Sequence, residues 1–320
     1  MYMQVFRSVH VNILQPNERI TFDLYVKRDH KLIPFIAKDE VLTQDQLLEA
    51  HRGGISRLYV QGKDRELLEK YMNSFLERIL TNPAIPTVEK ARAFYLSSSY
   101  AMQKAFEYPN AESIEEIKNS VKPILKNIMK DDLILNELIS TIEHDHCTYT
   151  HSINVGIIAT ALTIKFYDRD LQVGIGEMER LSYGYFLHDI GKSRITPAIL
   201  KKAGPLTDEE WKVMKKHPEW GYSILMETGH LTDEATYISL QHHERPNGSG
   251  YPKGVKIHDI HPCARICAIA DTFDALISER PYKTALMPFE ALTIMKQEAY
   301  CEVDTHLLAT LINLLGPQHC

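Results

Sequence analysis

The sequence predicts a mainly α-helical protein with a small α+β unit at its N-terminus. Ile20, Phe22, Leu24 and Val26 alternate with more polar residues, which is typical of a half-buried strand. After Pro86 apolar residues recur at three- and four-residue spacing almost to the end of the chain, which indicates amphipathic helices. The 320 residues have ordinary globular composition and are enough for two domains.

The N-terminal unit is expected to contain two paired strands, a short helix, another strand and a longer helix. These elements fall at residues 20–26, 31–37, 43–53, 55–60 and 64–80. Thr43 and Gln46 have the spacing of a capping box at the start of the short helix, and Gly53 and Gly54 would end it. No catalytic cluster is evident in this stretch, so we interpret it as a regulatory or dimerisation module.

The remaining chain divides at the linker 82–86, which contains two prolines. Helices are expected at 87–107, 111–129 and 131–145. The first two would either bridge the domains or form a helical dimer interface. We therefore expect three regions, namely an N-terminal module, a helical linker region and a catalytic domain at 1–82, 83–130 and 131–320.

Composition restricts the partners and the compartment. The net charge of −6 predicts no basic face for duplex nucleic acid, so an anionic substrate would depend on metals and a few Lys or Arg residues. The five cysteines are odd in number and scattered, which favours free thiols in a reducing compartment. The longest apolar run, 155–164, is too short to span a bilayer. Residues 1–10 lack the apolar core of a signal peptide. We therefore expect a cytoplasmic protein without membrane contact.

The residues that carry chemistry are concentrated between His188 and Pro252. His188 and Asp189 open this stretch, His242 and His243 follow, and a Gly-Ser-Gly-Tyr-Pro segment closes it at 248–252. Imidazole and carboxylate together bind divalent first-row metals, and an aspartate can use its second oxygen on a second ion. Two ions about 3.5–4 Å apart are a common arrangement for in-line attack on a phosphodiester.

Helical spacing leaves the role of two other histidines open. His151 shares a helix face with Val155, Ile158 and Leu162. Thr207 and Glu210 have the spacing of a capping box that opens another helix, on which Trp211, Met214 and His217 follow at intervals of three residues. Each histidine taken alone is best explained by packing. Gly191 is expected in a left-handed conformation past a helix end, so that Lys192 would lie beside the metals as a cation facing substrate phosphate.

Local geometry constrains the other candidates. His242 and His243 would point about 100° apart on a helix, so the helix must end or distort there if both bind one metal. Asp271 and Asp274 lie in an apolar helix, where a carboxylate needs a cation. Asp271 is interpreted as a ligand, and Asp274 as a residue that supports a ligand or faces the substrate. Arg280 precedes a proline and would either grip a phosphate or face solvent.

These motifs together resemble the HD phosphohydrolase superfamily and, within it, the HD-GYP subfamily. The resemblance covers roughly residues 130–300. It rests on His-Asp-Ile-Gly-Lys, His-His-Glu-Arg, Gly-Ser-Gly-Tyr-Pro, Asp-Thr-Phe-Asp-Ala-Leu and Arg-Pro-Tyr at residues 188–192, 242–245, 248–252, 271–276 and 280–282. It implies an all-helical HD-type metal-dependent phosphohydrolase domain. It also implies a phosphodiesterase that converts cyclic di-GMP to pGpG and then GMP.

The resemblance also implies the roles of individual residues. The implied metal ligands are His151, His188, Asp189, His217, His242, His243 and Asp271, with Asp189 bridging two ions. The implied cofactors are two divalent ions per chain, iron first and manganese as the alternative. The expected substrate contacts are Lys192, Tyr251, Asp274, Arg280 and Lys283. Some members hold a third metal with a Glu at the position of Cys147, and since a thiol matches a hard oxygen site poorly, we expect two metals here.

The mechanistic hypothesis is hydrolysis by a metal-bridging hydroxide, with Asp189 and Lys192 as catalytic residues. Two alternatives remain at this point. The domain would act as a receptor for a cyclic dinucleotide or a protein partner without hydrolysing anything, or it would hydrolyse another cyclic nucleotide. The expected partners are cyclic di-GMP and either a second copy of the chain or a signalling protein.

Overall fold

The structure is a computed structural model that describes most of the chain. The described residues are 6–11, 14–28, 31–82, 85–128, 138–139, 148–167, 175–279, 285–302 and 304–316. The chain divides into two units, residues 1–97 and 98–320. The domain bounds expected at 82/83 and 130/131 stay predictions, and the second of them falls outside the described residues, as does most of the helix predicted at 131–145.

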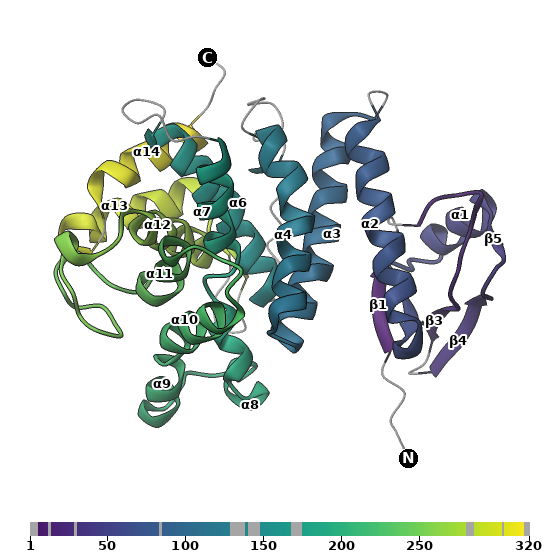
Figure 1. Cartoon of the computed structure of the whole chain (residues 1–320), viewed down its shortest axis with the longest axis horizontal. Coiled ribbons are helices and arrows are strands. Elements are labelled where there is room, and N and C mark those ends of the chain that lie inside the picture. The colour runs from purple at the N-terminus through teal and green to yellow at the C-terminus, as the bar shows by residue number, and fades with distance from the viewer. Residues whose placement is uncertain are drawn as a thin grey trace. The chain divides into compact units, whose positions relative to one another are not determined.

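An antiparallel sheet and two helices form most of the described part of the N-terminal unit, as the sequence predicts (Figure 1). The sheet has the strand order β1-β6-β3-β4, and its strands are β1 (Phe6–His10), β6 (Arg57–Gln61), β3 (Leu24–Arg28) and β4 (Lys31–Ile36). A short ribbon pairs β2 (Glu18–Arg19) with β5 (Val41–Leu42). The helices are α1 (Gln44–Arg52) and α2 (Arg65–Thr81).

Two details of this unit differ from the expectation. Ile20 and Phe22 are fully buried, as their alternation predicts, but the strand begins only at Leu24. The reason is that Ile20 exchanges backbone hydrogen bonds with the loop at residues 39–40 instead of with a strand. The sequence pattern also gives no sign of β1, which pairs with β6 along its whole length.

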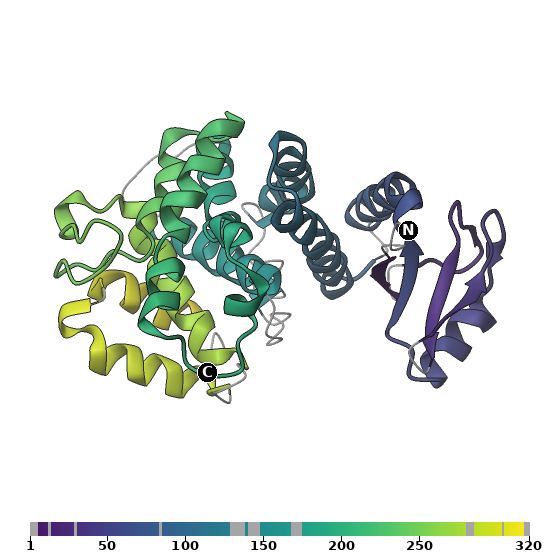
Figure 2. The same ribbon diagram turned by 90° about the horizontal axis from the view of Figure 1, so that it is seen from below.

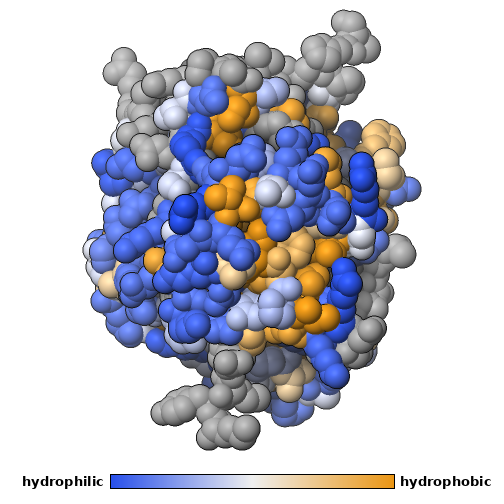
Figure 3. All heavy atoms as spheres, turned by 90° about the vertical axis from the view of Figure 1, so that its right-hand side faces the viewer, coloured by the Kyte–Doolittle hydropathy of each residue, from blue (hydrophilic) through white to orange (hydrophobic). Residues whose placement is uncertain are grey.

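The start and end of α1 follow from local signals. Thr43 accepts a hydrogen bond from the backbone of Gln46, and the Gln46 side chain accepts one from the backbone of Thr43. This is the predicted capping box. Gly53 follows the last helical residue. On the surface of this unit, Ile33, Val41 and Leu48 are exposed, and Figure 3 shows a face of the molecule on which apolar side chains gather among hydrophilic ones.

The regular secondary structure in the described residues of the C-terminal unit is helical, apart from one isolated bridge in a loop. Its helices begin with the second half of α3 (Thr87–Glu107), which agrees with the predicted range, and with α4 (Ala111–Ile128). The others are α6 (Thr148–Tyr167), α7 (Ile175–Phe186), α8 (Pro197–Leu200), α9 (Asp208–Met214), α10 (His217–Thr228), α11 (Asp233–Gln241), α12 (Pro262–Ile277), α13 (Pro288–Glu302) and α14 (Thr305–Leu315). Short 3₁₀ turns lie at η3 (Ile190–Arg194) and η4 (Ile257–Asp259).

Helix α6 lies at the centre of this unit. It packs against α7, α12 and α14 (Figure 2), and every residue from 152 to 163 is buried. This explains the apolar run at 155–164, because a helix surrounded by protein has no polar face. No described helix is long and apolar enough to cross a membrane. Cys263 and Cys267 on α12 are buried free thiols, as expected.

The contact between η3 and α10 corrects the role predicted for Gly191. This residue does not have the left-handed conformation expected past a helix end. A Cβ atom at Gly191 would instead lie 2.0 Å from the carbonyl oxygen of His217 and 2.5 Å from the backbone nitrogen of Gly221. Glycine is therefore required because two backbones approach closely, and this approach brings His217 next to the His188–Asp189 pair.

Candidate metal centre

The seven residues predicted as metal ligands come together from five separate elements. His151 lies in the first turn of α6, and His217 is the first residue of α10. The pairs at 188–189 and 242–243 follow the last residues of α7 and α11, and Asp271 lies on α12. Helix α11 ends at Gln241. This is the helix end that the sequence analysis requires if both neighbouring histidines face one site.

Asp189 is shared by two groups of possible ligands. Its Oδ1 lies 3.2 Å from His217 Nε2 and 3.7 Å from His242 Nε2. Its Oδ2 lies 3.5 Å from Nε2 of both His151 and His188. Within each group the ligand atoms lie within 4.8 Å of one another, and His243 joins the first group. A carboxylate with one oxygen turned to each group has the arrangement of a bridging ligand.

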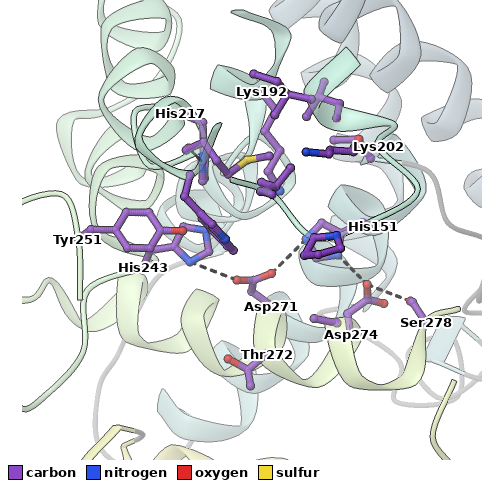
Figure 4. Close-up of a pocket in the computed structure, with 18 of the residues that line it drawn as sticks. His151, Lys192, Lys202, His217, His243, Tyr251, Asp271, Thr272, Asp274 and Ser278 are labelled. Carbon is purple, nitrogen blue, oxygen red and sulfur yellow. Dashed lines mark hydrogen bonds and ion pairs between the residues drawn. The ribbon is translucent and has the colours of Figure 1, made fainter. Parts of the chain in front are cut away.

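Asp271, on α12, connects the same two groups. Its Oδ1 lies 3.1 Å from His151 Nε2, and its Oδ2 lies 3.7 Å from His243 Nδ1. Figure 4 shows Asp271 between these two imidazoles, with dashed lines to both. All seven predicted ligands therefore belong to one continuous cluster.

Backbone carbonyls fix the orientation of three imidazoles. In His188, His217 and His242 the Nδ1 atom lies 2.9, 2.7 and 2.8 Å from the carbonyl oxygen of the residue three positions earlier. A carbonyl only accepts hydrogen bonds, so each Nδ1 must carry the proton and each Nε2 must carry a lone pair. The three Nε2 atoms lie 3.5, 3.2 and 3.7 Å from an oxygen of Asp189. A histidine that donates its other N–H to a carbonyl in this way has the orientation typical of a metal ligand.

His151 is oriented by a carboxylate. Its Nδ1 lies 2.7 Å from Asp274 Oδ2, and Asn154 donates to Asp274 Oδ1 at 2.8 Å. Ser278 donates to the same carboxylate at 3.3 Å, and Asp274 is fully buried. These contacts agree with a supporting role toward a ligand, which is one of the two roles that the sequence allows. The substrate contact predicted for Asp274 stays a prediction.

Two buried atoms of the cluster, His188 Nε2 and Asp189 Oδ1, have no hydrogen-bonding partner within the described part of the chain. In addition, Nε2 of His217 and Nε2 of His242 lie only 3.3 Å apart, although both carry lone pairs. Unpaired buried acceptors and opposed lone pairs are costly unless a cation is bound between them. The donor set of imidazoles and carboxylates fits divalent metal ions.

Electrostatics place most of these groups in the protonation state that a metal needs. Burial alone would raise the pKa of Asp189, but Lys192 and the neighbouring imidazoles hold it well below its ordinary value. Burial lowers the pKa of His188 to about 3, and it also lowers the pKa of His217 and His243. These three imidazoles are neutral at pH 7, so their lone pairs are free to bind a cation.

His151 differs from the other histidines. Burial would lower its pKa, but hydrogen bonds to Asp271 and Asp274 raise it to about 9. Burial would raise the pKa of Asp271, but the hydrogen bond and the positive charge of His151 hold it well below its ordinary value. Without a bound metal, His151 is therefore a cation between two carboxylates. A metal ion bound to His151 would take the place of one of its protons.

This geometry agrees with the comparison to known families. A family model described as "HD domain" matches residues 150–307. Residues 150–307 belong to the HD domain family. The matched range begins next to His151 and includes the other six clustered residues, which confirms the resemblance drawn from the motifs.

Relatives of this HD domain protein include named phosphodiesterases. A cyclic di-GMP phosphodiesterase of Pseudomonas aeruginosa is 32% identical over 177 residues, which is 55% of this chain and 42% of that protein. The 3'3'-cGAMP-specific phosphodiesterase 3 of Vibrio cholerae is 36% identical over 153 residues, which is 46% of this chain and 33% of that protein. The chain thus matches less than half the length of either relative.

A solved structure supports the fold over nearly the whole chain. The HDG"Y"P protein Bd1817 of Bdellovibrio bacteriovorus matches with a TM-score of 0.74 and 21% identity. The match covers 97% of this chain and 99% of that one. The fold class predicted from sequence, a helical HD-type domain preceded by a small α+β unit, is therefore confirmed.

The loop of the HD domain that carries Tyr251 is held against the cluster. The Tyr251 ring stacks on His243 at 4.7 Å between centroids, and its backbone N–H donates to the His243 carbonyl. Glu244 is buried and accepts hydrogen bonds from the backbone of Lys253 at 2.7 Å and of Val255 at 3.1 Å. Sequence reasoning assigned no role to Glu244. Its only signal was its position directly after the two histidines.

Beside the cluster the HD domain has a cavity of about 710 Å³. Lys192, which contacts Asp189 Oδ2 and is one-fifth exposed, lines it together with Tyr251. Lys202 and Arg245 add two further cations. The apolar part of the lining includes Ile199, Leu200, Pro205, Leu206, Trp211 and Met214. A cavity of this size, with convergent polar groups and an apolar wall, is typical of a small-molecule site.

Three residues named in the sequence predictions lie outside the described residues. They are Arg280 and Lys283, predicted to contact substrate, and Cys147, at the position linked to a third metal. The predictions for these three residues are therefore not tested by the geometry.

Proposed function

We propose that this chain is a metal-dependent phosphodiesterase that hydrolyses cyclic di-GMP to pGpG, GMP or both. The observation that carries the proposal is the position of Asp189, whose two oxygens face two separate pairs of imidazoles beside a nucleotide-sized cavity. Two ions held side by side are suited to phosphodiester cleavage. The named activities of the relatives support a cyclic dinucleotide as the substrate class.

The proposed ligands divide between two divalent ions. His217, His242 and His243 would hold one ion and His151 and His188 the other, with Asp189 shared between the two groups and Asp271 as a further ligand. Iron is the first expectation and manganese the alternative, because a nitrogen-rich set with carboxylates suits both. When bound, the ions supply Lewis-acid activation of water and of a phosphodiester. A chain with a net charge of −6 gains from them the local positive charge that an anionic substrate needs.

The chain's own residues complete the proposed site. Lys192 lies at the cluster and would neutralise negative charge that grows on the phosphate oxygens. Burial, reinforced by Asp271 and Asp189, raises the pKa of Tyr251, so its phenol stays neutral and can donate a hydrogen bond to the phosphate. Arg280 and Lys283 remain proposed contacts to the substrate.

The two alternatives remain testable against this proposal. The hydrolysis of 3'3'-cGAMP is favoured by one relative's name, and both cyclic dinucleotides share the same ring of two phosphodiesters. A receptor without activity is less favoured, because the described ligand set is complete. A homodimer or a signalling protein partner also stays a proposal.

One assay separates these functions. Protein purified without oxygen is reconstituted with iron or manganese and incubated with cyclic di-GMP, 3'3'-cGAMP, cyclic di-AMP and cyclic mononucleotides. Products are resolved by chromatography. Product from cyclic di-GMP supports the proposal. Binding without product supports a receptor, and product only from another nucleotide supports the other hydrolase.

Two variants test the assigned roles. Asp189→Ala should abolish turnover and lower the metal content, because both ligand groups lose their shared member. Lys192→Ala should keep the metal and reduce turnover, and unchanged kinetics would refute its role. Lys212→Ala is the matched control, since Lys212 is 75% exposed on α9 and does not line the cavity.

A further inference from the structure

Helix α9 presents an exposed tryptophan to the cavity beside the metal cluster. Trp211 is 45% exposed and lines the cavity together with Met214, one turn further along the same helix. Tryptophan is among the largest apolar side chains, and leaving it exposed within a concave site forgoes the gain of burial. A large aromatic surface left open inside a cavity is typical of a surface that a ligand covers.

Local contacts define the start of the helix that carries Trp211. Thr207 and Glu210 form the predicted capping box at its start, and Lys202 forms an ion pair with the same glutamate. This pair joins α9 to the end of α8. The indole is therefore carried one residue after Glu210, the residue that takes part in both of these contacts.

The end of the same helix is joined directly to the metal cluster. The carbonyl oxygen of Met214 accepts the hydrogen bond from His217 Nδ1 at 2.7 Å. The residue that orients one cluster imidazole thus also lines the cavity, three residues from Trp211. This link connects the aromatic surface to the cluster, where a phosphate would lie.

We propose that Trp211 and Met214 form a subsite that stacks one purine base of the cyclic dinucleotide while a phosphate lies at the metal cluster. This inference rests on the proposed function and adds a residue that determines substrate affinity. Stacking on an indole does not distinguish between purines, because every base has an aromatic face. The subsite therefore selects a nucleotide over a simple phosphodiester, without selecting guanine over adenine.

Kinetics of the full-length, metal-loaded protein test the subsite. Loss of a stacking residue typically weakens binding of a base about 5- to 150-fold. Trp211→Ala should raise KM for cyclic di-GMP by such a factor with little change in kcat, and Trp211→Phe should recover most of the loss. Inhibition by inorganic phosphate, which has no base, should be the same in all variants. Phe289→Ala is the control, since Phe289 is 80% exposed on α13 and lies outside the cavity lining.

Fluorescence gives a second test that does not depend on turnover. The chain has two tryptophans, so a Trp220→Phe variant reports on Trp211 alone. Cyclic di-GMP should quench this signal on binding, and inorganic phosphate should not. An unchanged KM in Trp211→Ala together with unquenched fluorescence would overturn the subsite while the proposed function stands. If the wild type hydrolyses no cyclic dinucleotide, the proposed function fails. The quenching of Trp211 fluorescence by cyclic di-GMP still tests whether the subsite binds a base.

Discussion

Replacing Glu244 by glutamine should loosen the loop that presents Tyr251. The glutamate carboxylate accepts two backbone hydrogen bonds, from Lys253 and Val255, and is 2% exposed. Glutamine keeps one accepting oxygen and turns an NH₂ group toward the other backbone N–H. One charge-assisted hydrogen bond is lost, which costs about 1.5–3 kcal/mol.

This loss should appear as faster amide exchange in the loop. At about 1.4 kcal/mol for each factor of ten, the amides of Lys253 and Val255 should exchange about 10- to 150-fold faster in Glu244→Gln. Hydrogen–deuterium exchange followed by mass spectrometry on peptides covering 250–256 measures this. Glu219→Gln on α10 is the control, because Glu219 is exposed. Equal exchange rates in wild type and Glu244→Gln would refute the view that this carboxylate holds the loop.

Three further predictions follow from the cluster. Asp274→Ala should lower metal affinity about 10- to 100-fold, because His151 loses its orienting partner, and competition with a chelator measures this. The raised pKa of His151, about 9, means that a metal must displace one proton at pH 7, so affinity should rise about tenfold per pH unit and level off above pH 9. Calorimetry in buffers of different ionisation enthalpy should accordingly find about one proton released. Gly191→Ala should lower the melting temperature and the metal content, since its Cβ would collide with the His217 carbonyl, and a variant equal to wild type in both would contradict the close contact.

Features that depend on neighbouring residues in the chain could be predicted from the sequence. The capping boxes at Thr43 and Thr207 and the end of α11 before His242 depend on hydrogen bonds that span only a few residues. The range of α3 was predicted for the same reason, because helical periodicity is local. Four of the seven clustered residues were identified because adjacent His-Asp and His-His pairs are rarely explained by packing. Asp271 was identified as a carboxylate in an apolar helix, and the ligand roles of His151 and His217 came from the family resemblance.

Features that depend on distant residues could not be predicted in this way. The need for glycine at 191 arises from the backbone of His217, and the burial of Glu244 arises from a loop that folds back on it. Strand β1 forms because β6, about fifty residues later, lies beside it. The exposure of Trp211 also depends on how α9 packs, and its spacing with Met214 and His217 would equally fit a buried face.

The enclosure of α6 has a consequence for which substitutions damage the protein. Residues 152–163 have no solvent-facing side, so a bulkier side chain at any of them presses on a neighbour whichever way it points. This buried stretch begins next to His151, and its twelve residues extend roughly 18 Å along the helix axis. In a saturation mutagenesis screen, harmful changes should therefore continue along the whole length of this helix, far beyond the atoms that take part in the reaction.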